Sequence, residues 1–133
     1  MNSRVLVVDD EAAIRHAVAR LLRRERWEVV TAATGGEALA ALEMRPVAAV
    51  LLDYHLPGMS GAELGAEIVR RWPEMSSRLL FVSGDPGLTP AEFPASCRGA
   101  RLLAKPFDLL ELAAEVRALA TPDRPSSSPG RPA

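Results

Sequence analysis

The chain has 133 residues, of which 48% are hydrophobic and 25% charged, the usual balance of one globular domain. The net charge of −1 argues against direct binding of nucleic acid. A single cysteine, Cys97, permits no internal disulfide and favours a cytoplasmic location. No apolar run approaches the roughly 20 residues of a membrane helix, and the acidic residues near the N-terminus argue against a signal peptide.

Short apolar runs and helical spacing alternate along the chain. The runs predict strands buried on both faces, at Arg4–Val8, Glu28–Ala32, Val47–Leu52, Arg78–Val82 and Arg101–Ala104. Apolar residues at helical spacing predict helices around Ile14–Leu22, Ala38–Leu42, Leu64–Val69 and Leu109–Leu119. This alternation favours a doubly wound α/β fold, with a five-stranded parallel sheet and helices on both faces.

The segment Gly84–Gly99 interrupts the alternation. Its turn formers, which include Pro86, Gly87, Pro90 and Pro94, leave room for only a short or irregular fourth helix. Asp108 is expected to cap the last helix. From Thr121 the composition changes to Pro, Ser, Gly and Arg, so we expect a domain over residues 1–120 and a disordered tail or linker over residues 121–133.

Polar residues stand at the carboxyl ends of four predicted strands. Asp9 and Asp10 follow the first strand, Asp53 the third, Ser83 the fourth and Lys105 the fifth. Ligands of open parallel sheets bind outside these ends, so we expect the five side chains to share one site. Composition supports this, because the only lysine among sixteen basic residues and three of the six aspartates lie here.

The residue types at this edge indicate phosphoryl chemistry. Crowded carboxylates repel each other unless a cation intervenes, and Mg²⁺ prefers carboxylate and phosphate oxygens, so the three aspartates predict a Mg²⁺ site. The Ser83 hydroxyl and the Lys105 ammonium would donate to a neighbouring oxyanion. Asp53 leads into a predicted tight turn at Leu56–Met59, which should expose its carboxylate for attack on phosphorus and formation of an acyl phosphate.

Four segments resemble motifs of the receiver domains of two-component response regulators. They are Val7–Glu11, Asp53–Gly61, Val82–Gly84 and Lys105–Phe107, and the resemblance extends from Arg4 to about Ala120. It implies the flavodoxin-like strand order 2-1-3-4-5. It also implies a phosphoacceptor module, not an enzyme, that takes its phosphoryl group from a histidine kinase or a histidine phosphotransfer protein.

The resemblance assigns roles around the metal. It implies that Asp53 is the phosphoacceptor and a Mg²⁺ ligand, and that Asp10 is a direct ligand. Asp9 would be a ligand or a water-mediated partner, and the backbone carbonyl of His55 a further protein oxygen. His55 and Asp85 stand at positions that tune the lifetime of the phosphoryl group in this family.

The remaining roles concern switching. Ser83 resembles the hydroxyl that turns inward to the phosphoryl group, and Lys105 resembles the cation that pairs with the phosphoryl group. The Lys105–Pro106 peptide bond resembles one that is cis in the family. Receivers usually carry Tyr or Phe three residues before the lysine, where this chain has Leu102. We therefore expect phosphorylation without the usual aromatic switch, and an altered output surface near Gly84–Gly99.

Each residue also has a structural interpretation. Asp9 and Asp10 are favoured helix caps, Asp53 and Ser83 are ordinary turn residues, and Lys105 could be a solvated charge. Each interpretation suffices for its own residue. Together they require a coincidence across four strand ends.

We expect a phosphorylation-dependent signalling receiver that controls an unknown output partner by conformational switching. An alternative is the receiver segment of a hybrid histidine kinase or of a longer regulator. An Asp-nucleophile phosphatase of the haloacid dehalogenase type would need a second Asp two residues after Asp53, where His55 stands. A flavodoxin-like FMN carrier would need a Ser/Thr/Gly-rich phosphate loop where Asp9–Glu11 would repel the phosphate.

Overall fold

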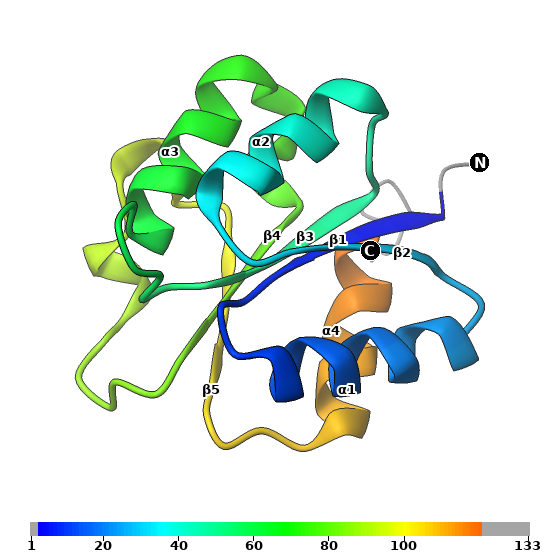
Figure 1. Cartoon of the computed structure of the whole chain (residues 1–133). Helices are drawn as coiled ribbons and strands as arrows, with labels where there is room; N and C mark the ends of the chain where they lie inside the picture. Colours follow the sequence, from blue (N-terminus) through cyan, green and yellow to red (C-terminus); the bar gives the residue numbers. More distant parts are fainter. Residues whose placement is uncertain (1–2, 121–133) are drawn as a thin grey trace, which may run out of the picture.

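The structure, a computed structural model, describes residues 3–120, so the tail expected at 121–133 lies outside the described residues. Strands and helices alternate as predicted (Figure 1). In chain order the elements are β1 (Arg4–Val8), α1 (Ala12–Arg24), β2 (Glu28–Ala32), α2 (Gly35–Met44), β3 (Ala49–Asp53), α3 (Gly61–Arg71), η1 (Pro73–Ser77), β4 (Leu79–Ser83), η2 (Pro90–Glu92), η3 (Ala95–Cys97), β5 (Arg101–Ala104) and α4 (Leu109–Ala120). None of the described helices has the length and apolarity that a bilayer span requires.

The five strands form one parallel sheet in the order β2-β1-β3-β4-β5, which confirms the predicted fold class. Helices α2 and α3 cover one face, and α1 and α4 cover the other (Figure 1). Alternate strand residues face the two layers: Leu6 and Val8 of β1 pack towards α2 and α3, and Val5 and Val7 towards α1 and α4. The central strands are therefore mostly apolar, as expected for a sheet buried on both faces, with Arg4, Asp53 and Ser83 at their ends.

Local signals in the sequence fix where three helices begin. Ser60 and Glu63 form a reciprocal capping box at the start of α3, and the Thr34 hydroxyl accepts a hydrogen bond from the Glu37 backbone N–H at the start of α2. Asp108 accepts the Leu110 backbone N–H at 2.8 Å, as predicted. These caps place the helix starts directly after the loops at the carboxyl edge of the sheet.

The segment between β4 and β5 holds two short 3₁₀ turns, η2 and η3, in place of a fourth α-helix, as predicted. Pro90 and Pro94 stand at the starts of these turns. Proline has no backbone N–H, so it is tolerated at the start of a helix but interrupts a helix that would run through it. The segment is anchored by Phe93, whose ring centroid lies 4.7 Å from that of Phe81. Cys97 is fully buried beside them, and this burial raises the pKa of its thiol.

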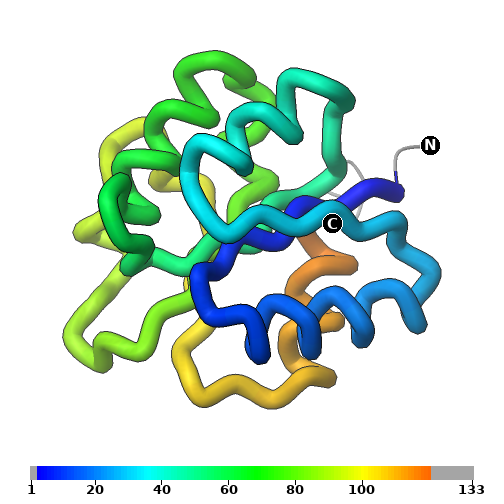
Figure 2. Tube along the Cα trace, viewed as in Figure 1, coloured from blue at the N-terminus to red at the C-terminus, as the bar shows by residue number. Residues whose placement is uncertain are grey.

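The loops that leave the strands lie at one end of the molecule. The Cα trace shows the chain emerging from β1, β3, β4 and β5 on the same side (Figure 2). This common edge is where the polar residues singled out in the sequence are found.

Candidate functional site

Three aspartates meet at this edge, as the sequence predicted. One carboxylate oxygen each from Asp9, Asp10 and Asp53 lie within 4.8 Å of one another. The parallel register brings Asp9 and Asp53 together, because Val8 of β1 lies opposite Leu52 of β3 and each is followed in the chain by an aspartate. Asp9 and Asp53 are only 5% and 6% exposed, so two of the three charges lie below the surface.

Lys105 provides the positive charge of the cluster. Its Nζ atom lies 3.4 Å from Asp53 Oδ2, 3.9 Å from Asp9 Oδ2 and 3.7 Å from Glu11 Oε1. The lysine backbone N–H donates to the Ser83 carbonyl at 2.8 Å, which holds the residue at the end of β5, and the Lys105–Pro106 bond is cis. Glu11, the N-cap residue of α1, was named in the sequence only as part of the Val7–Glu11 motif and was not assigned a role at the site. Three carboxylates therefore lie within 4 Å of a single ammonium group.

The Ser83 hydroxyl is buried and held by two neighbours. It accepts the Asp85 backbone N–H at 3.0 Å and lies 3.2 Å from Nε2 of His55. His55 also donates its backbone N–H to Asp53 Oδ1 at 3.0 Å, so this residue connects the hydroxyl with the acidic cluster. The imidazole contact could not be found in the sequence, because 28 positions separate the two residues.

An aromatic cluster lies beside this connection. The Tyr54 ring centroid is 5.4 Å from that of His55, 5.0 Å from Phe81 and 5.8 Å from Phe93. Leu102 packs half-buried against the same core cluster. The aliphatic side chain at this position has no ring to exchange between two orientations, so Tyr54 and Phe93 supply the aromatic contacts between the site and the β4–β5 segment.

Burial and crowding with other carboxylates both affect the titration of Asp9. Burial raises the pKa of its carboxyl group, and the nearby Asp53 and Glu11 carboxylates add to this effect. The hydrogen bond from the Glu11 backbone N–H and the Lys105 ammonium oppose it without offsetting it. The negative charge on Asp9 is thus unfavourable in the metal-free chain.

We expect the Asp9 charge to reduce stability as pH rises. The pKa of Asp9 in the native state is raised above its usual value of about 3.9. At any pH between the usual pKa and the raised pKa, the native state therefore binds more protons than the unfolded state. The free energy of unfolding contributed by this group therefore falls as pH increases through that window. Urea titrations in a metal chelator should show Asp9→Asn gaining stability over the wild type from pH 4 towards pH 7, whereas a constant difference would contradict the assignment.

Comparison with known proteins identifies similar chains over almost all of the described residues. A family model described as response regulator receiver domain matches residues 5–117. The chain is 31% identical over 115 residues to the probable transcriptional regulatory protein TcrX of Mycobacterium tuberculosis, which covers 86% of this chain and 48% of TcrX. It is 36% identical over 112 residues to the sensor histidine kinase AruS of Pseudomonas aeruginosa, which covers 81% of this chain and 11% of AruS. The chain thus spans about half the length of TcrX and a small part of AruS.

Solved structures give the same result. A CheY-like response regulator receiver domain protein from Methanospirillum hungatei has a TM-score of 0.80 at 31% identity, covering 90% of this chain and 94% of that one. The response regulator TrrA from Thermotoga maritima, solved in complex with Mg²⁺-BeF, has a TM-score of 0.76 at 31% identity, covering 90% of this chain and 99% of that one.

Proposed function

Because the chain belongs to the response regulator receiver domain family, we propose that its Asp53 accepts a phosphoryl group from a phosphohistidine of a histidine kinase or a phosphotransfer protein. The observation that carries the proposal is the convergence of the Asp53 carboxylate, the Lys105 ammonium and the other two aspartates at one edge of the sheet. Asp53 offers a nucleophile, and its neighbours offer the means to hold the charge that a phosphoryl group brings.

The donor set fits Mg²⁺. Three carboxylates converge with one ammonium among them, and hard oxygen ligands of this kind suit a small divalent cation that keeps some of its water. We assign Asp10, Asp53 and the His55 carbonyl as ligands, with Asp9 as a ligand or a water-mediated partner. Bound Mg²⁺ would supply positive charge that screens the carboxylates and the incoming phosphoryl oxygens. That the similar receiver TrrA was solved in complex with Mg²⁺-BeF supports the choice of metal.

The proposed transfer uses residues of the chain in distinct roles. An oxygen of the Asp53 carboxylate forms a bond to phosphorus as the phosphorus–nitrogen bond of the donor histidine breaks, and the histidine nitrogen keeps the electron pair. The Lys105 ammonium, 3.4 Å from Asp53 Oδ2, balances the charge that the phosphoryl group adds. The chain catalyses only its own phosphorylation and dephosphorylation. It offers a phosphoacceptor, but position 55 holds a histidine in place of the aspartate that would act as the general acid of a phosphatase.

The Ser83 hydroxyl is the proposed moving part. In this structure it lies against His55 and the Asp85 N–H, so it must leave the His55 ring to donate to a phosphoryl oxygen. Its departure would free His55 to change its contact with Tyr54, whose ring packs against Phe93 of the β4–β5 segment. We propose that this segment reports phosphorylation to an output partner, in place of an aromatic residue at position 102.

The output itself is proposed to lie in another part of a longer protein or in a separate partner. TcrX, which is about twice as long as the matched region, is named as a probable transcriptional regulatory protein, and AruS as a sensor histidine kinase. The receiver would serve either arrangement with the same chemistry.

Phosphotransfer from an autophosphorylated histidine kinase tests the proposal. We expect Mg²⁺-dependent transfer of label to the chain, loss of transfer in EDTA, and release of the label by hydroxylamine, which cleaves acyl phosphates. Labelling that persists in EDTA would contradict the metal assignment. Repeated turnover of a phosphomonoester with Mg²⁺ would instead favour the phosphatase.

A further inference from the structure

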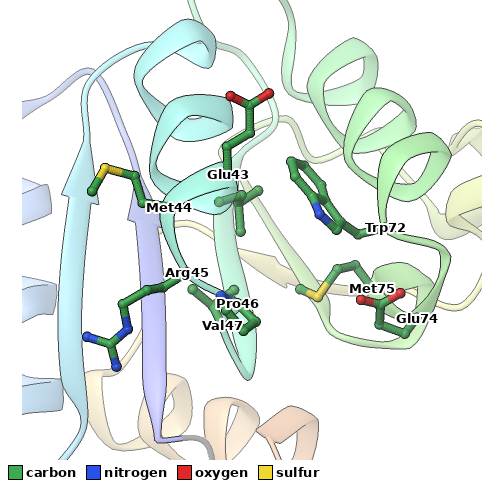
Figure 3. A pocket seen from close by; sticks show the side chains of 9 residues that line it. Glu43, Met44, Arg45, Pro46, Val47, Trp72, Glu74 and Met75 are labelled. Carbon is green, nitrogen blue, oxygen red and sulfur yellow. The ribbon is translucent and has the colours of Figure 1, made fainter.

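A groove lies at the edge of the sheet where the strands begin, opposite the acidic site. Its volume is about 270 Å³. The end of α2 and the segment before β3 form one wall, and Trp72 at the end of α3 with Met75 of η1 forms the other (Figure 3). We call it the Trp72 groove; its lining residues are Leu42, Glu43, Met44, Arg45, Pro46, Val47, Trp72, Glu74 and Met75.

The rim of the Trp72 groove is acidic. Glu43 and Glu74 stand on opposite walls, while the Met44 and Arg45 side chains point away from the space between them (Figure 3). Arg45 is engaged elsewhere, with its guanidinium 3.0 Å from a Glu28 carboxylate oxygen. Glu43 pairs with Arg71 at 2.8 Å, whereas Glu74 forms no ion pair with any residue from 3 to 120. The groove therefore offers an aromatic ring beside an uncompensated carboxylate.

The chain itself carries a segment of matching chemistry. The residues after α4 contain the pattern Pro-X-Arg-Pro twice, at Pro122–Pro125 and at Pro129–Pro132. Prolines three positions apart lie on one side of a polyproline II helix, and such segments bind aromatic-lined grooves at a low cost in conformational entropy. The arginine of each pattern complements a carboxylate at the rim.

Topology brings one of the two patterns within reach. Helix α4 runs antiparallel to the strands, so Ala120 lies at the same edge of the sheet as the groove but on the other face. Helical layers on opposite faces are about 20 Å apart, since packed layers are separated by about 10 Å. At the rise of about 3.1 Å per residue of a polyproline II helix, nine positions from Ala120 to Pro129 could reach about 28 Å, whereas two positions to Pro122 could reach only about 6 Å.

We propose that Pro129–Pro132 docks in the Trp72 groove of its own chain, with its prolines against Trp72 and Arg131 at Glu74. The connection within one chain gives this segment an effective concentration near the millimolar range, so a contact of modest affinity is occupied. The contact lies at the opposite edge from Asp53 and is independent of phosphoryl transfer.

The indole N–H signals of the full-length chain test the proposal by NMR. The chain has two tryptophans, and Trp27 packs, partly buried, against the core cluster between the sheet and helices α1 and α4, so it serves as an internal reference. We expect the double variant Pro129→Ala/Pro132→Ala to shift the Trp72 signal and leave the Trp27 signal unchanged. The matched variant Pro122→Ala/Pro125→Ala should leave both signals in place. Neither variant alters any of residues 3–120, and the two variants make the same kind of change, so a general loss of folding would affect both alike.

Charge exchange provides the second measurement. Glu74→Arg and Arg131→Glu should each move the Trp72 signal towards its position in the Pro129→Ala/Pro132→Ala variant, and the combined exchange should return it. An unchanged Trp72 signal in the proline variant would overturn the proposal. A shift in the wild type that disappears on dilution would also overturn it, because the groove would then bind a second copy of the chain.

Discussion

Asp53→Asn is expected to abolish formation of the acyl phosphate while the fold is retained. An amide nitrogen or oxygen at this position lacks the negative charge and nucleophilicity of the carboxylate, so no label should be transferred above background. In the wild type, Asp53 Oδ1 accepts the His55 backbone N–H at 3.0 Å. The amide oxygen of asparagine can accept the same hydrogen bond, so the fold should persist. Phosphotransfer from a labelled kinase, with circular dichroism to monitor folding, measures both results.

Asp108→Asn is the matched control for this variant. Asp108 caps α4 through the Leu110 N–H, a contact that asparagine also makes, and it contributes no atom to the acidic cluster. We expect it to accept label at the wild-type level. Wild-type labelling of Asp53→Asn would show that the acceptor is another residue and would remove the basis of the proposed function.

Gly61→Ala is expected to lower the free energy of unfolding by about 3 kcal/mol, the upper part of the usual range for overpacking. A Cβ atom at this position would come within 2.3 Å of the Asp53 carbonyl oxygen and 2.5 Å of Tyr54 Cα. Both are backbone atoms at the end of β3, so no side-chain rotation can relieve the clash. Urea unfolding followed by circular dichroism provides the measurement.

The close approach at Gly61 also positions the phosphoacceptor. The Gly61 N–H donates to the Tyr54 carbonyl at 2.9 Å and closes the loop that begins at Asp53. Gly58, at the tip of this loop, has a φ of +81°, which glycine adopts without steric cost. We expect Gly61→Ala to reduce phosphotransfer as well, because any shift that relieves the clash displaces the Asp53 backbone.

Gly36→Ala is the control for glycine replacement. Gly36 is exposed in the first turn of α2, and a Cβ there would meet only the Thr34 hydroxyl oxygen, at 4.0 Å. Alanine favours helix over glycine by up to about 1 kcal/mol, so this variant should be as stable as the wild type or more stable. Equal destabilisation of both variants would show that the clash at Gly61 is relieved within the native state.

The sequence determined the fold class and the edge of the sheet that carries the site. Apolar runs of four to six residues bounded by turn formers are typical of strands buried on both faces of a sheet, and the helical spacing between them favours crossover helices. Parallel strands share one carboxyl edge, so Asp9, Asp10, Asp53 and Lys105 had to lie near one another once the strands were recognised. The irregular β4–β5 segment followed from its prolines, which act locally.

Only the tertiary structure decided which side chains touch. His55 contacts Ser83, and Glu11 approaches Lys105. The backbone of Asp53 and Tyr54 lies against Gly61, and the Trp72 groove lies between the ends of α2 and α3. The residues that meet in these places are separated in sequence by intervals that carry no periodic signal. The periodicity of a helix or strand determines which of its faces a side chain points to. The contacts between side chains of different elements depend on how neighbouring layers pack and on which rotamers fit between them. The sequence therefore specified the acidic edge, and the packing of the loops above it specified the partners of each side chain.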